Sequence, residues 1–318
     1  MIRELAVIDL IGQLTQRPEY LADDAFLDPE TRQIYTTDML VEGRHFRMDY
    51  FSPKDLGWKA AAVNISDIAA MGGRLKYLLI SLGLPESCDD AWIRSLYAGL
   101  LAACAQFGGE IAGGDTVGSD RLVVNVTAVG ECPPAHTPGR RTGAEVGDYI
   151  VATGFHGLSG IGLRVLQAGE TGFDACKAAH LRPMPRIPEG LMLSKRFERY
   201  ALMDSSDGLA DALLKIAQAS GKKLVVDAAK VPLHPEVSAY CAHHGRDPWQ
   251  AVFYGGEDFE LVATVPEVDD ALLAHFAVIG RVEAADGNPG AWFRPVDQDT
   301  LQPLTLAETY QHFGASHA

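Results

Sequence analysis

Residues 55–72 read DLGWKAAAVNISDIAAMG, an alanine-rich stretch without proline that ends at the Gly72-Gly73 pair. Alanine is a strong helix former and a glycine pair is a common stop signal, so residues 54–71 are predicted to form a helix. The apolar residues 75–84 follow directly and predict a buried strand. Outward from this pair, helical and strand-like segments alternate through both halves of the chain. That alternation indicates the α/β class, with α+β as the related arrangement.

The other segments of regular structure fall on either side of one Pro- and Gly-rich stretch, residues 132–143. Its composition is typical of a linker, and we expect two domains, residues 1–133 and 145–318, joined by residues 134–144. Glycines at 113 and 114 make residues 110–116 look like a loop. Helices are expected at 2–14, 90–107, 158–168, 185–199 and 209–220, and strands at 33–38, 121–130, 148–153, 200–203, 224–227, 259–265, 277–282 and 292–295.

Charge restricts the possible partners. The 318 residues contain 27 Lys and Arg against 42 Asp and Glu, a formal net charge of −15, so nucleic acid and anionic membranes are poor partners. No membrane span or signal peptide is recognisable, and the five cysteines form no C-x-x-C pair, so we expect a cytoplasmic protein with reduced thiols. A phosphate-bearing ligand would have to arrive with metal cations.

Aspartates recur where the predicted elements end, beside hydroxyl groups and glycines. Any one of them has an ordinary structural explanation: Asp207, for example, could simply cap the helix at 209–220. Together they suggest several Mg²⁺ ions, because Mg²⁺ takes oxygen ligands from one or two carboxylates plus substrate phosphates. Neighbouring glycines would let backbone N–H groups approach phosphate oxygens. The motifs are Asp23-Asp24, Thr36-Thr37-Asp38, Asp67, Gly113-Gly114-Asp115-Thr116, Asp204-Ser205-Ser206-Asp207-Gly208 and Gly255-Gly256-Glu257-Asp258.

Read in order, these motifs resemble the thiamine-monophosphate kinase family, in the superfamily of aminoimidazole ribonucleotide synthetase and selenophosphate synthetase. The resemblance spans about residues 20 to 313 and includes residues 36–46 (TTDMLVEGRHF), 55–72, 204–209 (DSSDGL) and 255–261 (GGEDFEL). It implies a synthetase-like fold whose N-terminal domain dimerises, and transfer of a phosphoryl group from ATP to thiamine monophosphate. Three departures from the family pattern are Ala22, where glycine is usual, Thr36, where serine is common, and Arg44, which precedes His45.

The resemblance also implies a role for individual residues. Its Mg²⁺ ligands would be Asp24, Thr36, Thr37, Asp38, Asp67, Asp115, Asp204 and Asp207. Its ATP contacts would be Gly114, Asp115, Arg141 and Ser206. Its substrate contacts would be His45, Glu257 and Tyr310. From the residues alone, His45 could equally be a packed turn residue, Tyr310 an ordinary helix residue, and Arg141 part of a solvated linker, whereas Trp58 is expected in the core.

The chemistry agrees with these roles. Both substrates are anions, and two unit charges about 4 Å apart repel by roughly 4 kcal/mol at an effective dielectric constant near 20. Mg²⁺ bridging the phosphates would offset that repulsion and align them in line. The acceptor phosphate oxygen is already deprotonated near neutral pH, so no general base is expected.

Three alternatives remain at this point. The chain could be another ATP-dependent member of the superfamily, although its first cysteine, Cys88, lies too late for a selenophosphate synthetase and its last residues, GASHA, lack the cysteine of the hydrogenase-maturation relative. It could be a two-metal phosphohydrolase that uses the same carboxylates, or a module that binds ATP without turnover.

Overall fold

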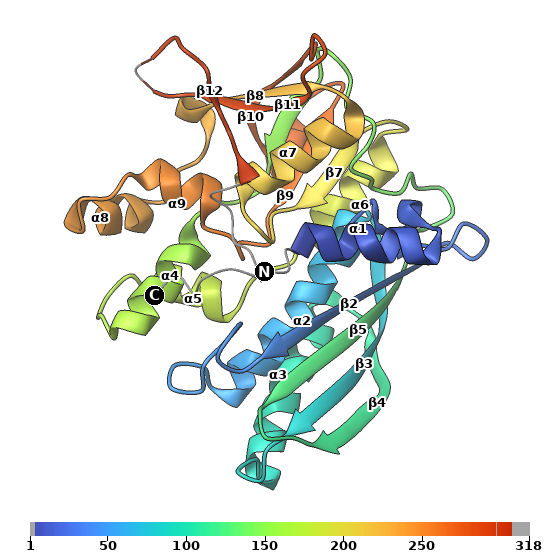
Figure 1. The fold of residues 1–318 in the computed structure, drawn as a ribbon, viewed down its shortest axis with the longest axis vertical. Helices are drawn as coiled ribbons and strands as arrows, with labels where there is room; N and C mark the ends of the chain where they lie inside the picture. The colour runs from blue at the N-terminus through green and yellow to red at the C-terminus, as the bar shows by residue number, and fades with distance from the viewer. Residues whose placement is uncertain (1–3, 297, 307–318) are drawn as a thin grey trace.

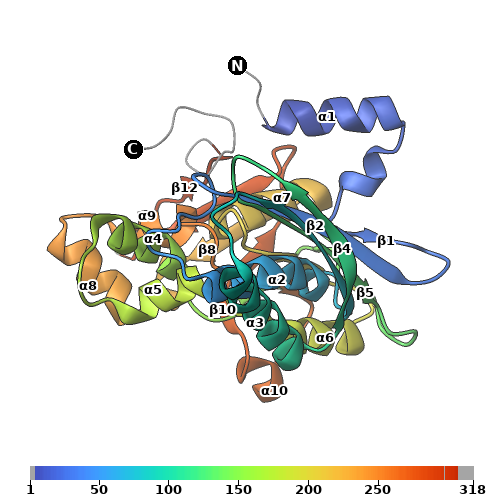
Figure 2. The same ribbon diagram turned by 90° about the horizontal axis from the view of Figure 1, so that it is seen from below.

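Two β-sheets organise the chain in the computed structural model, which describes residues 4–296 and 298–306 (Figure 1). The first sheet has the strand order β1-β2-β5-β3-β4. Two long helices, α2 and α3, cover one of its faces (Figure 2). Elements of this half are α1 (Glu4–Thr15), β1 (Phe26–Leu27), β2 (Gln33–Val41), α2 (Pro53–Ala70), β3 (Arg74–Leu84), α3 (Asp90–Phe107), β4 (Glu110–Gly118) and β5 (Val123–Glu131), with a 3-10 turn at Pro18–Leu21.

The predicted central helix is confirmed as α2. Ser52 caps its first turn, its Oγ accepting a hydrogen bond of 3.1 Å from the backbone N–H of Asp55, and Pro53 begins the helix. Its apolar residues pack on the sheet face that carries Ile80 and Val126. At Gly99 of α3, a Cβ would lie 1.9 Å from the carbonyl oxygen of Lys54, so glycine allows α2 and α3 to cross almost in backbone contact.

Residues 110–116 are not the predicted loop, because they belong to strand β4. β4 pairs in parallel with β3 at the edge of the sheet, with Gly114 opposite Ile80. A Cβ at Gly114 would lie 1.7 Å from the carbonyl oxygen of Ile80, and its φ of 151° is unfavourable for other residues. The glycines therefore mark a close approach of two strands, which the sequence does not distinguish from a turn.

The second sheet has seven strands in the order β12-β11-β8-β10-β6-β9-β7. The sequence did not predict the short helices α5, α8, α9 and α10. The elements that it did predict in this half are confirmed within a few residues. The bounds are β6 (Tyr149–Ala152), α4 (Leu158–Ala168), α5 (Asp174–Leu181), α6 (Ile187–Arg196), β7 (Ala201–Asp204), α7 (Leu209–Ser220), β8 (Lys223–Asp227), α8 (Pro235–His243), α9 (Pro248–Tyr254), β9 (Leu261–Val265), α10 (Asp270–Leu273), β10 (Ala277–Glu283), β11 (Gly290–Arg294) and β12 (Gln302–Pro303), with a 3-10 turn at Ala228–Lys230.

Helix α2 also packs against the second half of the chain. A Cβ at Gly190 of α6 would lie 2.2 Å from the carbonyl oxygen of Ala69. Trp58 is buried as expected, and its Nε1 donates a hydrogen bond of 2.9 Å to the carbonyl oxygen of Pro183. One hydrophobic cluster runs from the first sheet through α2 to Leu261 of β9, so the two halves share a core.

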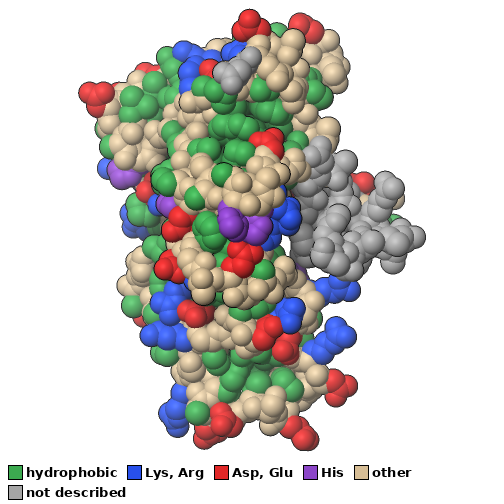
Figure 3. Space-filling model, turned by 90° about the vertical axis from the view of Figure 1, so that its left-hand side faces the viewer, with side chains coloured by type: hydrophobic (Ala, Val, Ile, Leu, Met, Phe, Trp, Pro, Cys, Tyr) green, Lys and Arg blue, Asp and Glu red, His purple; other side chains and the backbone are tan. Residues whose placement is uncertain are grey.

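Charged side chains of both signs lie on the surface of the molecule. Figure 3 shows one face of the molecule, on which acidic and basic side chains are interspersed. Within the described ranges, no helix combines the length and the apolar character that crossing a membrane requires.

Candidate functional site

Four aspartates come together between the two sheets, at the face of the first sheet that packs on α2, here called the inner face. Asp38 lies on β2, Asp67 on α2, Asp204 at the end of β7, and Asp24 on the loop before β1. Residues 36 and 38 of β2 point to the same face of the sheet, so Thr36 lies on the side of Asp38. There, Thr36 Oγ1 donates a hydrogen bond of 2.5 Å to Asp67 Oδ2.

Burial and mutual repulsion make these carboxylates reluctant to ionise. Burial raises the pKa of Asp67 well above its usual range, and the charges of Asp38, Asp204 and Asp24 raise it further. Burial likewise raises the pKa of Asp204 to about 7, with Asp24 and Asp38 adding to the effect. A hydrogen bond of 2.5 Å from Ser66 Oγ to Asp204 Oδ2 opposes that rise. A bound cation would relieve the repulsion.

The donor set fits Mg²⁺ rather than an ion held entirely by protein. Within residues 4–296 and 298–306, no three Asp, Glu, His or Cys side chains converge on one point as a ready metal site. Mg²⁺ usually keeps water and phosphate ligands, and so requires only one or two carboxylates at each ion. Asp204 Oδ1 is buried and accepts no hydrogen bond from the described residues, so it is free to bind an ion.

Arg141 belongs to this group and is not a solvated linker residue. Its Nη2 lies 2.5 Å from Asp24 Oδ1, and its backbone N–H donates to Asp23 Oδ1 at 2.9 Å. Arg140 forms an ion pair of 2.7 Å with Asp23. The segment after β5 thus holds the Asp23-Asp24 loop against the carboxylate group.

Two predicted metal ligands lie on the opposite, outer face of the first sheet. Thr37 points away from Asp38, and its Oγ1 donates to the carbonyl oxygen of Val126 at 3.1 Å. Asp115 is exposed on β4, in register with Ser81 on the outer face. Because β5 and β3 separate β2 from β4, the Cα atoms of Asp38 and Asp115 are on the order of 14 Å apart. Within one chain, the side chains of Thr37 and Asp115 therefore do not reach the four inner-face aspartates.

The loop after β7 and the loop before β9 are joined by backbone hydrogen bonds. Glu257 N–H donates to the carbonyl oxygen of Ser206 at 2.6 Å, and Ser205 N–H donates to that of Glu260 at 2.8 Å. Asp207 is half-buried and lies 3.5 Å from Lys215 Nζ; its side chain does not cap α7. Ser206 and Glu257, predicted to contact different substrates, are therefore fixed relative to each other.

Glu257 forms a buried ionic contact that the sequence did not reveal. Lys59 Nζ lies 2.8 Å from Glu257 Oε1, and His180 Nδ1 lies 3.5 Å from Glu257 Oε2. Burial opposes the charged form of Glu257, but the ammonium group of Lys59 outweighs that effect, so the pKa of Glu257 is lowered. His45 accepts a hydrogen bond of 3.0 Å at Nδ1 from the N–H of Val41, which fixes its ring beside Glu257.

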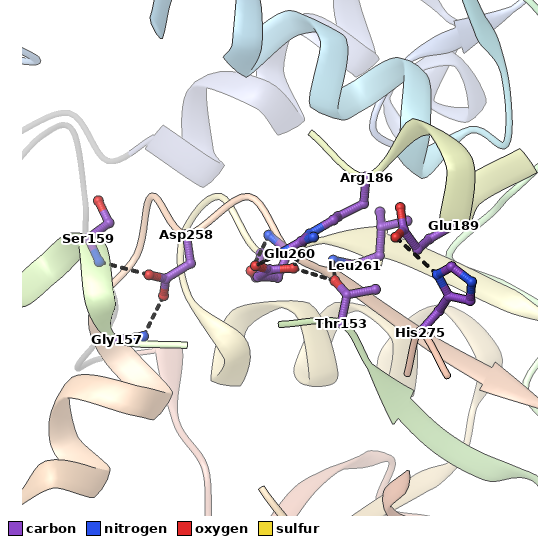
Figure 4. Close-up of polar contacts among 10 residues, drawn as sticks. Thr153, Gly157, Ser159, Arg186, Glu189, Asp258, Glu260, Leu261 and His275 are labelled. Carbon is purple, nitrogen blue, oxygen red and sulfur yellow. Dashed lines mark hydrogen bonds and ion pairs between the residues drawn. The ribbon is translucent and has the colours of Figure 1, made fainter. Parts of the chain in front are cut away.

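The polar residues next to Glu257 belong to motifs that the sequence singled out, but their contacts were not predicted. Asp258 accepts hydrogen bonds from the N–H groups of Gly157 (2.6 Å) and Ser159 (2.9 Å) at the start of α4, and burial raises its pKa to about 7 (Figure 4). Glu260 binds Arg186 through both oxygens, at 2.7 and 2.6 Å. For the contact between Lys59 and Glu257, the sequence did offer a signal: polar residues of α2, such as Lys59 and Asn64, interrupt an otherwise apolar run. Tyr310 lies outside the described residues.

Comparison with known proteins agrees with this arrangement. Residues 22–132 match the family model "AIR synthase related protein, N-terminal domain", and residues 145–289 match the corresponding C-terminal domain. The thiamine-monophosphate kinase of Aquifex aeolicus (strain VF5) is 35% identical over 291 residues, 89% of this chain and 92% of that protein. The Bacillus subtilis (strain 168) enzyme is 37% identical over 81% of this chain and 82% of its own length. The chain belongs to the thiamine-monophosphate kinase family.

Solved structures of the family have the same fold. AaThiL complexed with AMPPCP and TMP superimposes with a TM-score of 0.86 at 33% identity, over 98% of this chain and 97% of that one. Thiamine monophosphate kinase from Aquifex aeolicus gives 0.80 at 35% identity, over 91% and 96%. The hydrogenase maturation protein HypE, at 24% identity and a TM-score of 0.71, shares the fold.

Proposed function

We propose that this chain transfers the γ-phosphoryl group of ATP to thiamine monophosphate, giving thiamine diphosphate and ADP. The observation that carries the proposal is the inner-face group of Asp24, Asp38, Asp67 and Asp204, in which buried carboxylates repel one another. Such a group is unfavourable in a protein without cations, and cations are what an acidic chain requires to bind two phosphate substrates. The kinase relatives, similar over most of the chain, supply the substrate class.

Asp24, Asp38, Asp67 and Asp204, with Thr36 beside them, would hold Mg²⁺. Bound there, Mg²⁺ would supply positive charge that offsets the repulsion between the two phosphates and stabilises charge in the transition state. We assign Asp207 and Ser206 to the phosphate side, because their loop adjoins Asp204, and Arg141 to ATP. Glu257 and His45 would bind the ring portion of thiamine monophosphate. The acceptor phosphate oxygen is deprotonated near neutral pH, so no protein group has to remove a proton.

We also propose that the enzyme is a homodimer in the cytoplasm. The outer face of the first sheet exposes the apolar side chains of Tyr35, Met39, Tyr77, Leu79 and Val117. Exposed apolar side chains on one face of a sheet are typical of a subunit interface, and a second copy of the chain would cover them. Thr37 and Asp115 would then lie at the interface, with Gly114 beside them, which accounts for the place of these two side chains on the face opposite Asp38 within one chain. Five free thiols support a reducing compartment.

The decisive experiment incubates the purified chain with ATP, Mg²⁺ and thiamine monophosphate and separates the products by chromatography. Equal amounts of thiamine diphosphate and ADP, formed with Mg²⁺ and absent with EDTA, are expected. ADP and free phosphate without thiamine diphosphate would reject the kinase in favour of a phosphohydrolase. Binding of ATP without any turnover would reject it in favour of a binding module.

A further inference from the structure

Lys59 is a charged side chain with no exposed surface. It lies in the middle of α2, among residues that pack between the two sheets. Among the described residues, its ion pair with Glu257 Oε1 is the one salt bridge of its Nζ, and the ring of Phe51 lies 5.5 Å from that atom. Fully buried lysines are rare unless paired, because removing an ammonium group from water is costly. The position of Lys59 therefore requires an explanation.

His180 of α5 approaches the same carboxylate from the other side. Its Nδ1 lies 3.5 Å from Glu257 Oε2 and 3.1 Å from Ser159 Oγ. The rings of Phe51 and Tyr50 pack against it, at centroid distances of 5.6 and 6.4 Å. Burial and the charge of Lys59 lower the pKa of His180 to about 3, so its ring is neutral and the charge that balances Glu257 comes from Lys59.

Of the three side chains, only that of Glu257 is partly exposed, so Lys59 and His180 hold Glu257 from the buried side. Lys59 and His180 are buried, whereas a third of the Glu257 side chain is exposed. Glu257 also has a positive φ of 56°, and its N–H is held by Ser206. A strained backbone and two buried partners thus present one partly exposed carboxylate at a fixed place. A purely structural ion pair would not need the exposed part.

We propose that Lys59, with His180, is a positioning residue that fixes Glu257 as an ionised acceptor for the cationic ring portion of the substrate. The inference rests on the proposed function, and it explains a specificity that the phosphate site cannot provide. Thiamine monophosphate carries a permanent positive charge on its thiazolium ring and an amino group on its pyrimidine ring. An ionised, oriented carboxylate attracts both, and holding it in place before the substrate arrives reduces the entropy lost on binding.

The test compares KM values for the two substrates in the full-length enzyme. Lys59→Met is expected to raise KM for thiamine monophosphate by about tenfold or more, the usual effect of losing a residue that orients a ligand-binding group. KM for ATP and kcat should stay within about twofold, because uniform substrate binding is what is lost. Lys59→Arg, which keeps the charge, should restore most of the affinity. Lys54→Met, an exposed lysine on the same helix, is the matched control and should behave as wild type.

A double variant separates positioning from folding. Lys59→Met alone leaves Glu257 without its partner, so the protein could lose stability for that reason alone. Lys59→Met combined with Glu257→Gln removes both charges and should fold like wild type, with KM for thiamine monophosphate still raised as in Glu257→Gln. A wild-type KM in the double variant would overturn the inference, as would an equal loss for ATP in Lys59→Met. If the wild-type chain makes no thiamine diphosphate, the proposed function itself fails, and this inference fails with it.

Discussion

Asp204 is a residue at which stability and function oppose each other. Its carboxylate is 1% exposed, and burial raises its pKa from 3.8 to about 7. Between these two values the folded protein binds a proton at Asp204 that the unfolded chain has released. The contribution of Asp204 to the free energy of unfolding of the metal-free protein therefore falls as the pH rises from about 4 to 7, because the folded state holds this proton in that range.

Replacing the carboxylate by a neutral amide should remove this penalty. Asp204→Asn is expected to raise the free energy of unfolding of the metal-free protein at pH 8 by up to about 4 kcal/mol and to leave it nearly unchanged at pH 4. The same variant should lose about 100-fold or more in kcat/KM, because a proposed Mg²⁺ ligand is gone. Urea denaturation at the two pH values, with and without Mg²⁺, measures the first effect and an activity assay the second.

Asp270→Asn, at an exposed position of α10 away from the proposed interface, is the matched control for that experiment. Its unfolding free energy should keep the wild-type dependence on pH. If Asp204→Asn instead destabilised the metal-free protein at pH 8, the carboxylate would be a stabilising group and not a site waiting for a cation.

The position of a site residue was predictable where an acid stands at the end of an element, as for Asp204. Asp38 was also expected at a strand end, but β2 continues to Val41 and Asp38 lies within the strand. Those motifs are local, and so is their chemical meaning. Lys59 and His180 were not predictable because their role depends on α2 and α5 meeting at Glu257, a contact across about 200 residues of chain. A lysine within an alanine-rich helix looks the same whether it faces water or a buried carboxylate.

At the scale of elements, β4 depends on a glycine. Gly114→Ala would place a methyl group 1.7 Å from the carbonyl oxygen of Ile80, at a φ of 151° that alanine avoids. We expect β4 to separate from β3, with a loss of about 2–3 kcal/mol in the free energy of unfolding. Activity should fall as well, because the neighbouring Asp115 would lose its place.

Gly118→Ala on the same strand is the matched control, since a Cβ there would have no atom within 4 Å. Thermal or urea unfolding of the two variants beside wild type measures the difference. Equal stability of Gly114→Ala and Gly118→Ala would contradict the close approach of β4 to β3.

The same strand explains which elements the sequence could predict. α2, β3 and α3 have long uninterrupted patterns, and their predicted bounds agree with the structure to within a residue. The loop predicted at residues 110–116 was wrong because paired glycines favour turns in general, whereas in β4 they allow two parallel strands to approach. The helices α5, α8 and α9 have at most nine residues, too few for a clear periodicity.

At the scale of the whole molecule, the shared core lets helix α2 fix the two parts of the proposed site relative to each other. Helix α2 carries Asp67 toward the carboxylates and Lys59 toward Glu257, while packing on both sheets. The phosphate side and the ring side of the proposed site are thus two parts of one rigid helix, eight positions apart. The overall class and the alternation of elements were predictable; this joint role of α2 was not, because it arises from packing between the halves.

The outer face of the first sheet leads to the last prediction. Leu79 lies on that face among exposed Tyr77, Met39 and Val117. We expect light scattering to give wild type about twice the chain mass of 34.2 kDa. Leu79→Glu should shift the protein to the monomer mass, because a charge buried in an apolar interface without a partner is unfavourable. Leu101→Glu, at an exposed position of α3, is the matched control and should remain dimeric.

An activity assay tests what the proposed dimer contributes. Thr37 and Asp115 lie on the outer face, away from the four inner aspartates, so they can take part only if a second chain completes the site. The Leu79→Glu monomer is therefore expected to lose most of its kcat/KM while keeping a wild-type far-ultraviolet circular dichroism spectrum. A folded monomer with full activity would contradict this, and it would restrict the phosphate site to the inner-face aspartates of a single chain.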